Sequence, residues 1–242
     1  LYLILITQML FISPPFGNYI SLPHTMSIKG SYTLEPRPGL FQQILKTFRY
    51  SFLHNGWVNK IGLRNKGLVY GISHYNSKRD IISIAILQKA EIPEILKILP
   101  EDTNIELNIS CPNVNKSLEH NGLSQFLNPH RQWCIIKLSP LTDMKLVDSY
   151  YKQGFRQFHC SNTIPIKEGG LSGTAIIPYT SNLIQSIKTT YSDVELIGGG
   201  GIYDWKTLTD YKKLGADHFS VSTIFLKPIN LSVFFWNFYM NL

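Results

Sequence analysis

The chain has 242 residues, of which 44% are hydrophobic and 16% are charged, a composition that excludes a disordered or collagen-like protein. It carries 23 Lys and Arg against 16 Asp and Glu, a net charge of +7, which suits an anionic or phosphorylated ligand. The basic residues are scattered singly along the chain, so a solvated basic surface is favoured over a nucleic-acid interface.

The chain opens on an apolar segment, residues 1–12, which is too short to cross a bilayer and lacks the flanks of a signal peptide. We interpret most of it as a buried strand. The chain does not begin with Met, which is compatible with a fragment of a longer protein. Residues 9–13 and 27–33 are the two strand candidates of the first 79 residues.

Six short β-branched segments follow from residue 80 onward, each succeeded by a longer amphipathic stretch. They are residues 80–87, 105–110, 134–139, 155–162, 194–201 and 218–223. Repeated βα units imply a parallel sheet, and the two early candidates bring the strand count to eight. No linker or repeat interrupts the pattern. The sequence therefore predicts an α/β fold, a single-domain (β/α)₈ TIM barrel over residues 1–242.

Helical patterns lie between these strands. One spans residues 140–154, with Thr142 or Asp143 as the expected N-cap and Gly154 at its end. Another spans 203–214 and is closed by Gly215. The aromatic tail at 233–239 is predicted to be a terminal helix packed on the barrel, rather than a membrane-surface contact.

Glycine and hydroxyl side chains follow the last two predicted strands. Four consecutive glycines, residues 198–201, precede a helix, and Ser222 and Thr223 end the next strand. Residues without Cβ let backbone N–H groups approach an anion, and barrels often bind phosphate in the loops after strands seven and eight. The sequence therefore predicts a phosphate site.

Asparagines gather at other strand ends. Asn108, Asn113 and Asn162 lie near two of them, and Asn65 lies in a glycine-bounded turn. Carboxamides both donate and accept hydrogen bonds, as a flat ligand with alternating C=O and N–H groups requires. A turn-forming role is the alternative for each one.

Other side chains are open to two interpretations. Cys111, before Pro112, is either an exposed thiol that acts as a base or a buried structural cysteine. Lys137 within a strand requires an anion or an electron-rich ring. Cys134 and Cys160 are expected to be buried, and an odd number of cysteines without CxxC spacing favours a reducing, cytoplasmic setting. His159 and His218 are expected to be packed or surface histidines, and we predict no metal site.

The strand-end motifs together resemble the dihydroorotate dehydrogenase family, in the family's order. They are Glu106-Leu-Asn-Ile-Ser-Cys-Pro-Asn113, Ile136-Lys-Leu-Ser-Pro140, Ser161-Asn-Thr163, Gly169-Gly-Leu-Ser-Gly173, Ile197-Gly-Gly-Gly-Gly-Ile202 and Gly215-Ala-Asp-His-Phe-Ser-Val-Ser-Thr223. The resemblance covers about residues 27–226. A cysteine at position 111 is similar to the soluble branch of the family.

The resemblance implies an FMN-dependent oxidoreductase that converts dihydroorotate to orotate in pyrimidine (UMP) biosynthesis. Cys111 would be the base that removes the C5 proton while the C6 hydride goes to flavin N5. The implied FMN-binding residues are Ser31, Asn108, Lys137, Ser161, Gly173, Gly200, Gly201, Ser222 and Thr223. The implied substrate-binding residues are Asn65, Asn108, Asn113, Asn162 and Thr163. The flavin would supply the redox chemistry and the protein the orientation and positive charge.

The sequence also departs from the family pattern. A helix is missing from the first βα unit, Gly30 stands where the soluble branch has Lys, with Lys29 one residue off, and Ser83 stands where Asn is common. A diverged phosphate- or flavin-binding barrel with weak or no dihydroorotate turnover is therefore the alternative function. Beyond the small-molecule substrate, the resemblance implies pairing into a homodimer, with no nucleic acid and no integral membrane segment.

Overall fold

The computed structural model describes residues 8–109 and 122–242 of the chain. Eight parallel strands form a closed barrel in which neighbours along the chain are neighbours in the wall, and the last strand pairs with the first. They are β1 (Leu10–Ile12), β2 (Thr25–Tyr32), β5 (Asp80–Ile84), β6 (Ile105–Leu107), β7 (Cys134–Leu138), β8 (Gln157–Cys160), β11 (Glu195–Gly199) and β12 (His218–Val221). The predicted TIM barrel is confirmed, and each of its eight strands overlaps a predicted segment.

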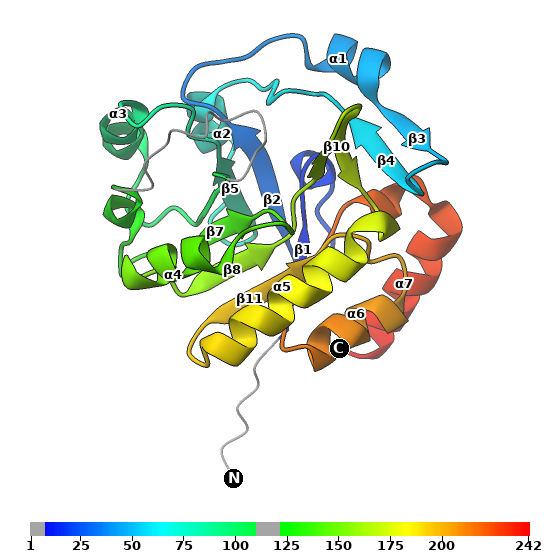
Figure 1. Cartoon of the computed structure of the whole chain (residues 1–242). Helices are drawn as coiled ribbons and strands as arrows, with labels where there is room; N and C mark the ends of the chain where they lie inside the picture. Colours follow the sequence, from blue (N-terminus) through cyan, green and yellow to red (C-terminus); the bar gives the residue numbers. More distant parts are fainter. Residues whose placement is uncertain (1–7, 110–121) are drawn as a thin grey trace.

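Helices surround this barrel (Figure 1). They are α1 (Leu40–Thr47), α2 (Leu68–Ser73), α3 (Glu91–Ile98), α4 (Met144–Lys152), α5 (Ile177–Thr190), α6 (Trp205–Lys213) and α7 (Pro228–Met240). All of them except α1, which lies beside β4 (Gly56–Asn59), have buried side chains. The N-cap of α4 is Asp143, whose carboxylate accepts a hydrogen bond from the Lys145 amide. Such caps satisfy amide groups that have no partner within the helix. Of the two N-caps expected for α4, the structure has Asp143.

The first crossover contains only a single 3₁₀ turn, η1 (Phe16–Asn18), between β1 and β2. Aromatic side chains from the other end of the chain pack beside it: Phe16 stacks on Phe225, and Phe225 contacts Phe235 of α7. The Tyr239 hydroxyl also donates to the Pro23 carbonyl. The missing first helix is thus confirmed, and the terminal helix packs on the barrel as predicted.

A second, four-stranded sheet joins two loops at one end of the barrel. Its strands are β3 (Arg49–Ser51), β4 (Gly56–Asn59), β9 (Ile164–Ile166) and β10 (Gly169–Ser172), in the order β3-β4-β10-β9. The first pair follows β2 and α1, and the second follows β8. Figure 1 shows β3 and β4 beside α1, with β10 next to β4. This sheet was not predicted.

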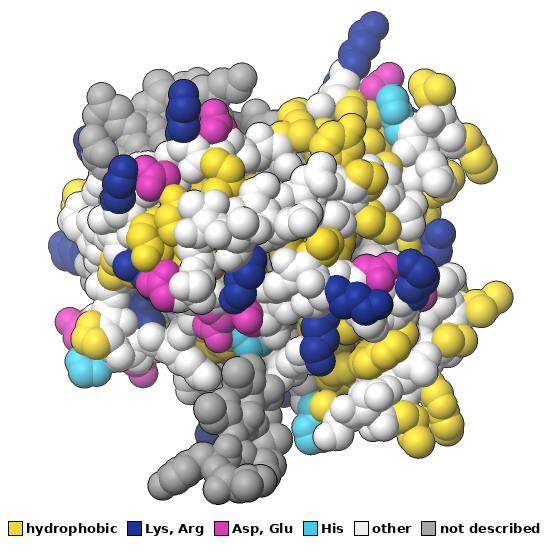
Figure 2. Space-filling view, turned by 60° about the horizontal axis from the view of Figure 1, so that its bottom comes forward, with side chains coloured by type: hydrophobic (Ala, Val, Ile, Leu, Met, Phe, Trp, Pro, Cys, Tyr) yellow, Lys and Arg dark blue, Asp and Glu magenta, His cyan; other side chains and the backbone are white. Residues whose placement is uncertain are grey.

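One face of the molecule carries its charges in small, mixed groups. On the face shown in Figure 2, Lys and Arg side chains lie dispersed among Asp, Glu and hydrophobic side chains, which agrees with the expected solvated basic surface. Within the described ranges, no helix is long and apolar enough to span a membrane.

Candidate active site

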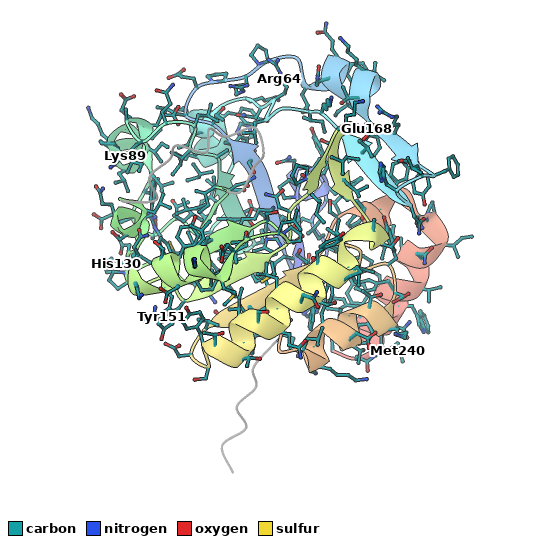
Figure 3. The ribbon with its side chains drawn as sticks, in the orientation of Figure 1. Arg64, Lys89, His130, Tyr151, Glu168 and Met240 are labelled. Atoms are coloured by element: carbon teal, nitrogen blue, oxygen red, sulfur yellow. The ribbon has the colours of Figure 1, made fainter. Side chains whose placement is uncertain are left out.

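A cavity of about 340 Å³ lies at the C-terminal ends of the barrel strands, within the size range of small-molecule sites. Residues of β7 and β12 and of the loops after β1, β8, β11 and β12 line it, beside β4 and β10. Figure 3 labels Arg64 and Glu168 at this end of the molecule, with His130 and Tyr151 toward the other. Nine predicted site residues are among the lining: Lys137, Ser161, Asn162, Thr163, Gly173, Gly200, Gly201, Ser222 and Thr223.

One side of the cavity has the character of a phosphate site. Gly200 and Gly201 follow β11 with φ angles of 86° and 77°, so their amide groups are placed by a conformation that favours glycine. Ser222 and Thr223 follow the neighbouring strand β12 and begin a 3₁₀ turn. The hydroxyl of Ser222 donates to the Pro14 carbonyl. Hydroxyls, glycine amides and the start of a helical turn together suit a phosphate group.

Replacing Gly201 by alanine is expected to destabilise the protein by about 1–3 kcal/mol from backbone strain, with a further steric loss. A Cβ there would lie 2.9 Å from the Gly173 carbonyl oxygen and 2.6 Å from Ile177 Cγ1. Gly39→Ala is the matched control, because Gly39 also has a positive φ but an added Cβ would have its nearest neighbour at 3.9 Å. Urea unfolding measures the free energy of unfolding of both variants. Equal losses in the two variants would contradict the expected steric contribution at Gly201.

A buried ion pair lies beneath the cavity. The Lys137 ammonium donates to Glu106 Oε1 at 3.2 Å, and His159 Nδ1 lies 2.5 Å from Glu106 Oε2. The other ring nitrogen of His159 lies 2.6 Å from the Ser220 hydroxyl. Glu106 and His159 are fully buried and Lys137 is 7% exposed. Lys137 therefore meets a carboxylate inside the barrel and also reaches the cavity wall.

Hydrogen bonds extend from this ion pair toward the predicted substrate amides. The Ser83 hydroxyl donates to Glu106 Oε1 at 2.7 Å and lies 2.8 Å from the Ser31 hydroxyl. Asn108 Nδ2 donates to Ser31 at 2.8 Å, and Asn162 Nδ2 donates to Asn108 Oδ1 at 3.1 Å. Ser31 and Asn108 do not line the cavity themselves, but both are linked to Asn162, which does.

Burial and charge oppose each other at the two titratable partners of Lys137. Burial raises the pKa of the Glu106 carboxyl, but the Lys137 charge and the hydrogen bonds from His159 and Ser83 outweigh it, and the pKa falls to about 2. Burial lowers the pKa of His159 against the attraction of Glu106. We therefore assign an ionised Glu106 and a neutral His159 that donates from Nδ1.

These shifts predict a loss of stability on acidification in two ranges. His159 has a folded pKa below its ordinary 6.5, so below that pH the unfolded state binds the proton first and stability falls. The stabilisation from ionised Glu106 is lost between its ordinary 4.5 and about 2. Urea unfolding across the acid range measures both, with His159→Gln expected to remove the upper loss and Glu106→Gln the lower. If the free energy of unfolding of the variants depends on pH in the same way as that of the unsubstituted protein, the assigned charge states of Glu106 and His159 are contradicted.

Other predicted site residues lie elsewhere. The Asn65 side chain is engaged in its own turn: Oδ1 accepts from the Gly67 amide, and Nδ2 donates to Thr33 and to the Leu63 carbonyl. It does not line the cavity. Cys111 and Asn113 lie outside the described residues. Lys29, one position from the expected lysine, pairs with the buried Asp80 at 2.7 Å and is likewise absent from the cavity lining.

The remaining cysteines are buried as expected, and burial raises the pKa of Cys134 to about 12 and that of Cys160 still further. His159 is packed inside the barrel, also as expected. Sequence reasoning missed its partner Glu106. A charged residue between Ile105 and Leu107 of a predicted strand is the signal that could have found it, since burying a charge requires a partner.

The chain is similar to proteins of a known family. The profile of the family described as dihydroorotate dehydrogenase matches residues 18–228. The catalytic subunit of dihydroorotate dehydrogenase B (NAD(+)) of Endomicrobium trichonymphae is 30% identical over 234 residues, which cover 82% of this chain and 74% of the relative. The protein of that name from Phocaeicola vulgatus is 28% identical over 208 residues, covering 72% and 68%.

Solved structures share the fold. The ligand-free DHODH of Eimeria tenella superposes with a TM-score of 0.65 at 17% identity, covering 93% of this chain and 81% of that one. The complex of the same organism's DHODH with ferulenol gives a TM-score of 0.67 at 16% identity, covering 94% and 79%.

Proposed function

Because this chain belongs to the dihydroorotate dehydrogenase family and is an oxidoreductase that acts on CH–CH donors, we propose that it oxidises dihydroorotate to orotate, in pyrimidine biosynthesis, with FMN as cofactor. One observation carries the proposal: nine residues that the motifs assign to flavin or substrate, from loops distant in sequence, line a single cavity at the C-terminal end of the barrel. Catalytic residues of barrel enzymes lie at that end.

The residues present fit FMN. Gly200, Gly201, Ser222 and Thr223 would hold the phosphate, and Lys137 would stand beside the ring system. The Ser13 hydroxyl lines the same cavity and is buried without a hydrogen-bond partner, which supports a polar ligand there. Apolar side chains, among them Phe16 and Ile176, complete the wall and suit a flat ring.

The protein's own residues would transfer the proton, bind the substrate and stabilise charge on the flavin. Cys111, as thiolate, would take the proton from C5 of dihydroorotate. Asn113, Asn162 and Thr163 would bind the substrate's carboxylate and ring amides, with Asn108 linked to Asn162 by a hydrogen bond. Bound FMN would supply the acceptor for the C6 hydride at N5, and the Lys137 ammonium would stabilise negative charge on the reduced ring.

The relatives' names support a proposal about partners. They are named as catalytic subunits of an NAD(+) enzyme, so we propose that this chain also works with a further subunit and with NAD⁺ as an electron acceptor. Pairing with a second copy is compatible with this. A cytoplasmic location, with residues 1–242 forming one FMN-binding domain, completes the proposal.

The visible absorption spectrum of the purified protein, recorded without oxygen before and after dihydroorotate is added, tests the function. We expect flavin bands that bleach on addition. Flavin bands that persist would support FMN as the cofactor and would contradict dihydroorotate as the substrate. A colourless protein that FMN cannot reconstitute would favour the diverged phosphate-binding barrel instead.

A further inference from the structure

We propose that Glu106 is the positioning residue of this site: its buried carboxylate orients both the Lys137 ammonium and, through a chain of side chains, the amides of Asn108 and Asn162. The inference rests on the proposed function for the roles of those groups toward FMN and substrate. Its geometric basis is one continuous hydrogen-bonded network inside the barrel, centred on Glu106, a residue to which the family resemblance assigns no ligand.

The first branch holds the lysine. Lys137 donates to Oε1 of the carboxylate while His159 donates to Oε2. Because Nδ1 of His159 carries the proton, its Nε2 is an acceptor, and the Ser220 hydroxyl therefore donates to it. Ser220 lies on the cavity wall. Both carboxylate oxygens are thereby fixed, and the ammonium can approach from one direction only.

The second branch leads to the amides. Ser83 donates its hydrogen to Oε1, so its oxygen accepts from the Ser31 hydroxyl. Ser31 in turn accepts from Asn108 Nδ2, and Asn108 Oδ1 accepts from Asn162 Nδ2. Asn162 Oδ1 accepts from the Thr163 amide. The orientation of the Asn108 and Asn162 side-chain carboxamides is thus set by their hydrogen-bond partners.

Every donor in the two branches points toward Glu106. An ionised carboxylate has only acceptor sites, so it fixes the direction of each hydroxyl and amide on the way to the cavity. A carboxamide at this position has one oxygen and one NH₂ group, and it conflicts with Ser83, Lys137 and His159 all donating at once. Loss of the charge also leaves Lys137 without its counter-ion.

Three variants test the inference. Glu106→Gln removes the charge at both branches, Ser83→Ala cuts only the amide branch, and Glu195→Gln is the matched control. Glu195 also pairs with a histidine, at 2.7 Å from His218 Nε2, but both stand at the starts of their strands, away from the cavity lining. The readouts are the midpoint potential of bound FMN, the KM for dihydroorotate and the kcat.

With Glu106→Gln we expect the FMN potential to rise, because an uncompensated Lys137 binds the reduced, more negative flavin more tightly. A tenfold change in that preference is about 30 mV for a two-electron couple. Ser83→Ala is expected to raise KM roughly three- to tenfold while the potential stays unchanged. Glu195→Gln should change neither. A Glu106→Gln potential equal to that of the control, or an unaltered KM in Ser83→Ala, would overturn the inference.

A measurement without flavin separates this inference from the proposed function. Peptide mass spectrometry of the apoprotein measures the rate at which an amine-reactive reagent modifies Lys137. We expect a several-fold faster rate in Glu106→Gln than in Glu195→Gln, and equal rates would refute the positioning role even if FMN never binds. Should Glu106→Gln fail to fold, Ser83→Ala still tests the inference, because an unaltered KM for dihydroorotate in that variant would overturn it.

Discussion

Replacement of Cys111 by alanine is expected to leave the protein yellow but to slow reduction of FMN by dihydroorotate by about 10²–10⁴-fold, the usual contribution of a general base. The thiol is proposed to accept the C5 proton, and alanine has no group that can do so. A stopped-flow measurement of flavin bleaching without oxygen gives the rate directly. Because an ordinary thiol has a pKa of roughly 8.5, the rate of the unsubstituted enzyme should also rise as the pH approaches that value.

Cys160→Ala is the control for this experiment. Cys160 ends β8, is fully buried, and has its pKa raised by that burial, so it has no part in proton transfer at neutral pH. Its variant should bleach at nearly the normal rate. Normal bleaching in Cys111→Ala would reject the cysteine as base, and loss of FMN from a folded Cys111→Ala protein would assign it to flavin binding instead.

Replacement of Lys137 by alanine is expected to weaken FMN binding and to lower the free energy of unfolding by about 3–5 kcal/mol, the typical loss when one partner of a buried ion pair is removed. Its partner Glu106 is fully buried and would be left without its cation. Urea unfolding measures the stability, and the ratio of flavin to protein absorbance measures the binding.

Two further variants separate charge from packing. Lys206→Ala removes an exposed pair with Asp210, whose ions lie 2.6 Å apart on the same helix, and should change the stability little. The double variant Lys137→Ala with Glu106→Gln should recover part of the lost stability, because no uncompensated charge remains. If Lys137→Ala is as stable as Lys206→Ala, the buried pair contributes little and its role in the fold is refuted.

Much of the barrel could be predicted because its strands are marked locally. Each one is a short β-branched segment followed by a polar strand end, and the spacing of these segments matches βα units. The second sheet could not be predicted, since β9 contains Pro165 and β10 begins with two glycines, and both residue types are depleted in strands. Gly169 and Gly170 indicate a turn when considered alone, and they form a strand because β9 and β4 supply partners.

The site divides in the same way. Gly201, Ser222 and Lys137 are detectable because their residue types are unusual at strand ends or interiors. The hydrogen bond between Glu106 and His159 cannot be detected from the sequence, because it joins residues 53 positions apart. It also depends on which side chains face into the barrel. Asn65 shows the opposite difficulty: an asparagine in a glycine-bounded turn has the same local sequence whether it binds a ligand or, as here, hydrogen-bonds within the turn.

The pairing of β1 with β12 has a consequence for synthesis of the chain. The Met9 amide bonds to a His218 ring nitrogen 209 positions away, so the seam of the barrel closes only after residue 218 has been translated. At about 5–20 residues per second, this interval is on the order of 10–40 s. Throughout it, one edge of Leu10–Ile12 remains unpaired on the nascent chain. Until β12 has been made, that edge is a template for pairing with another chain.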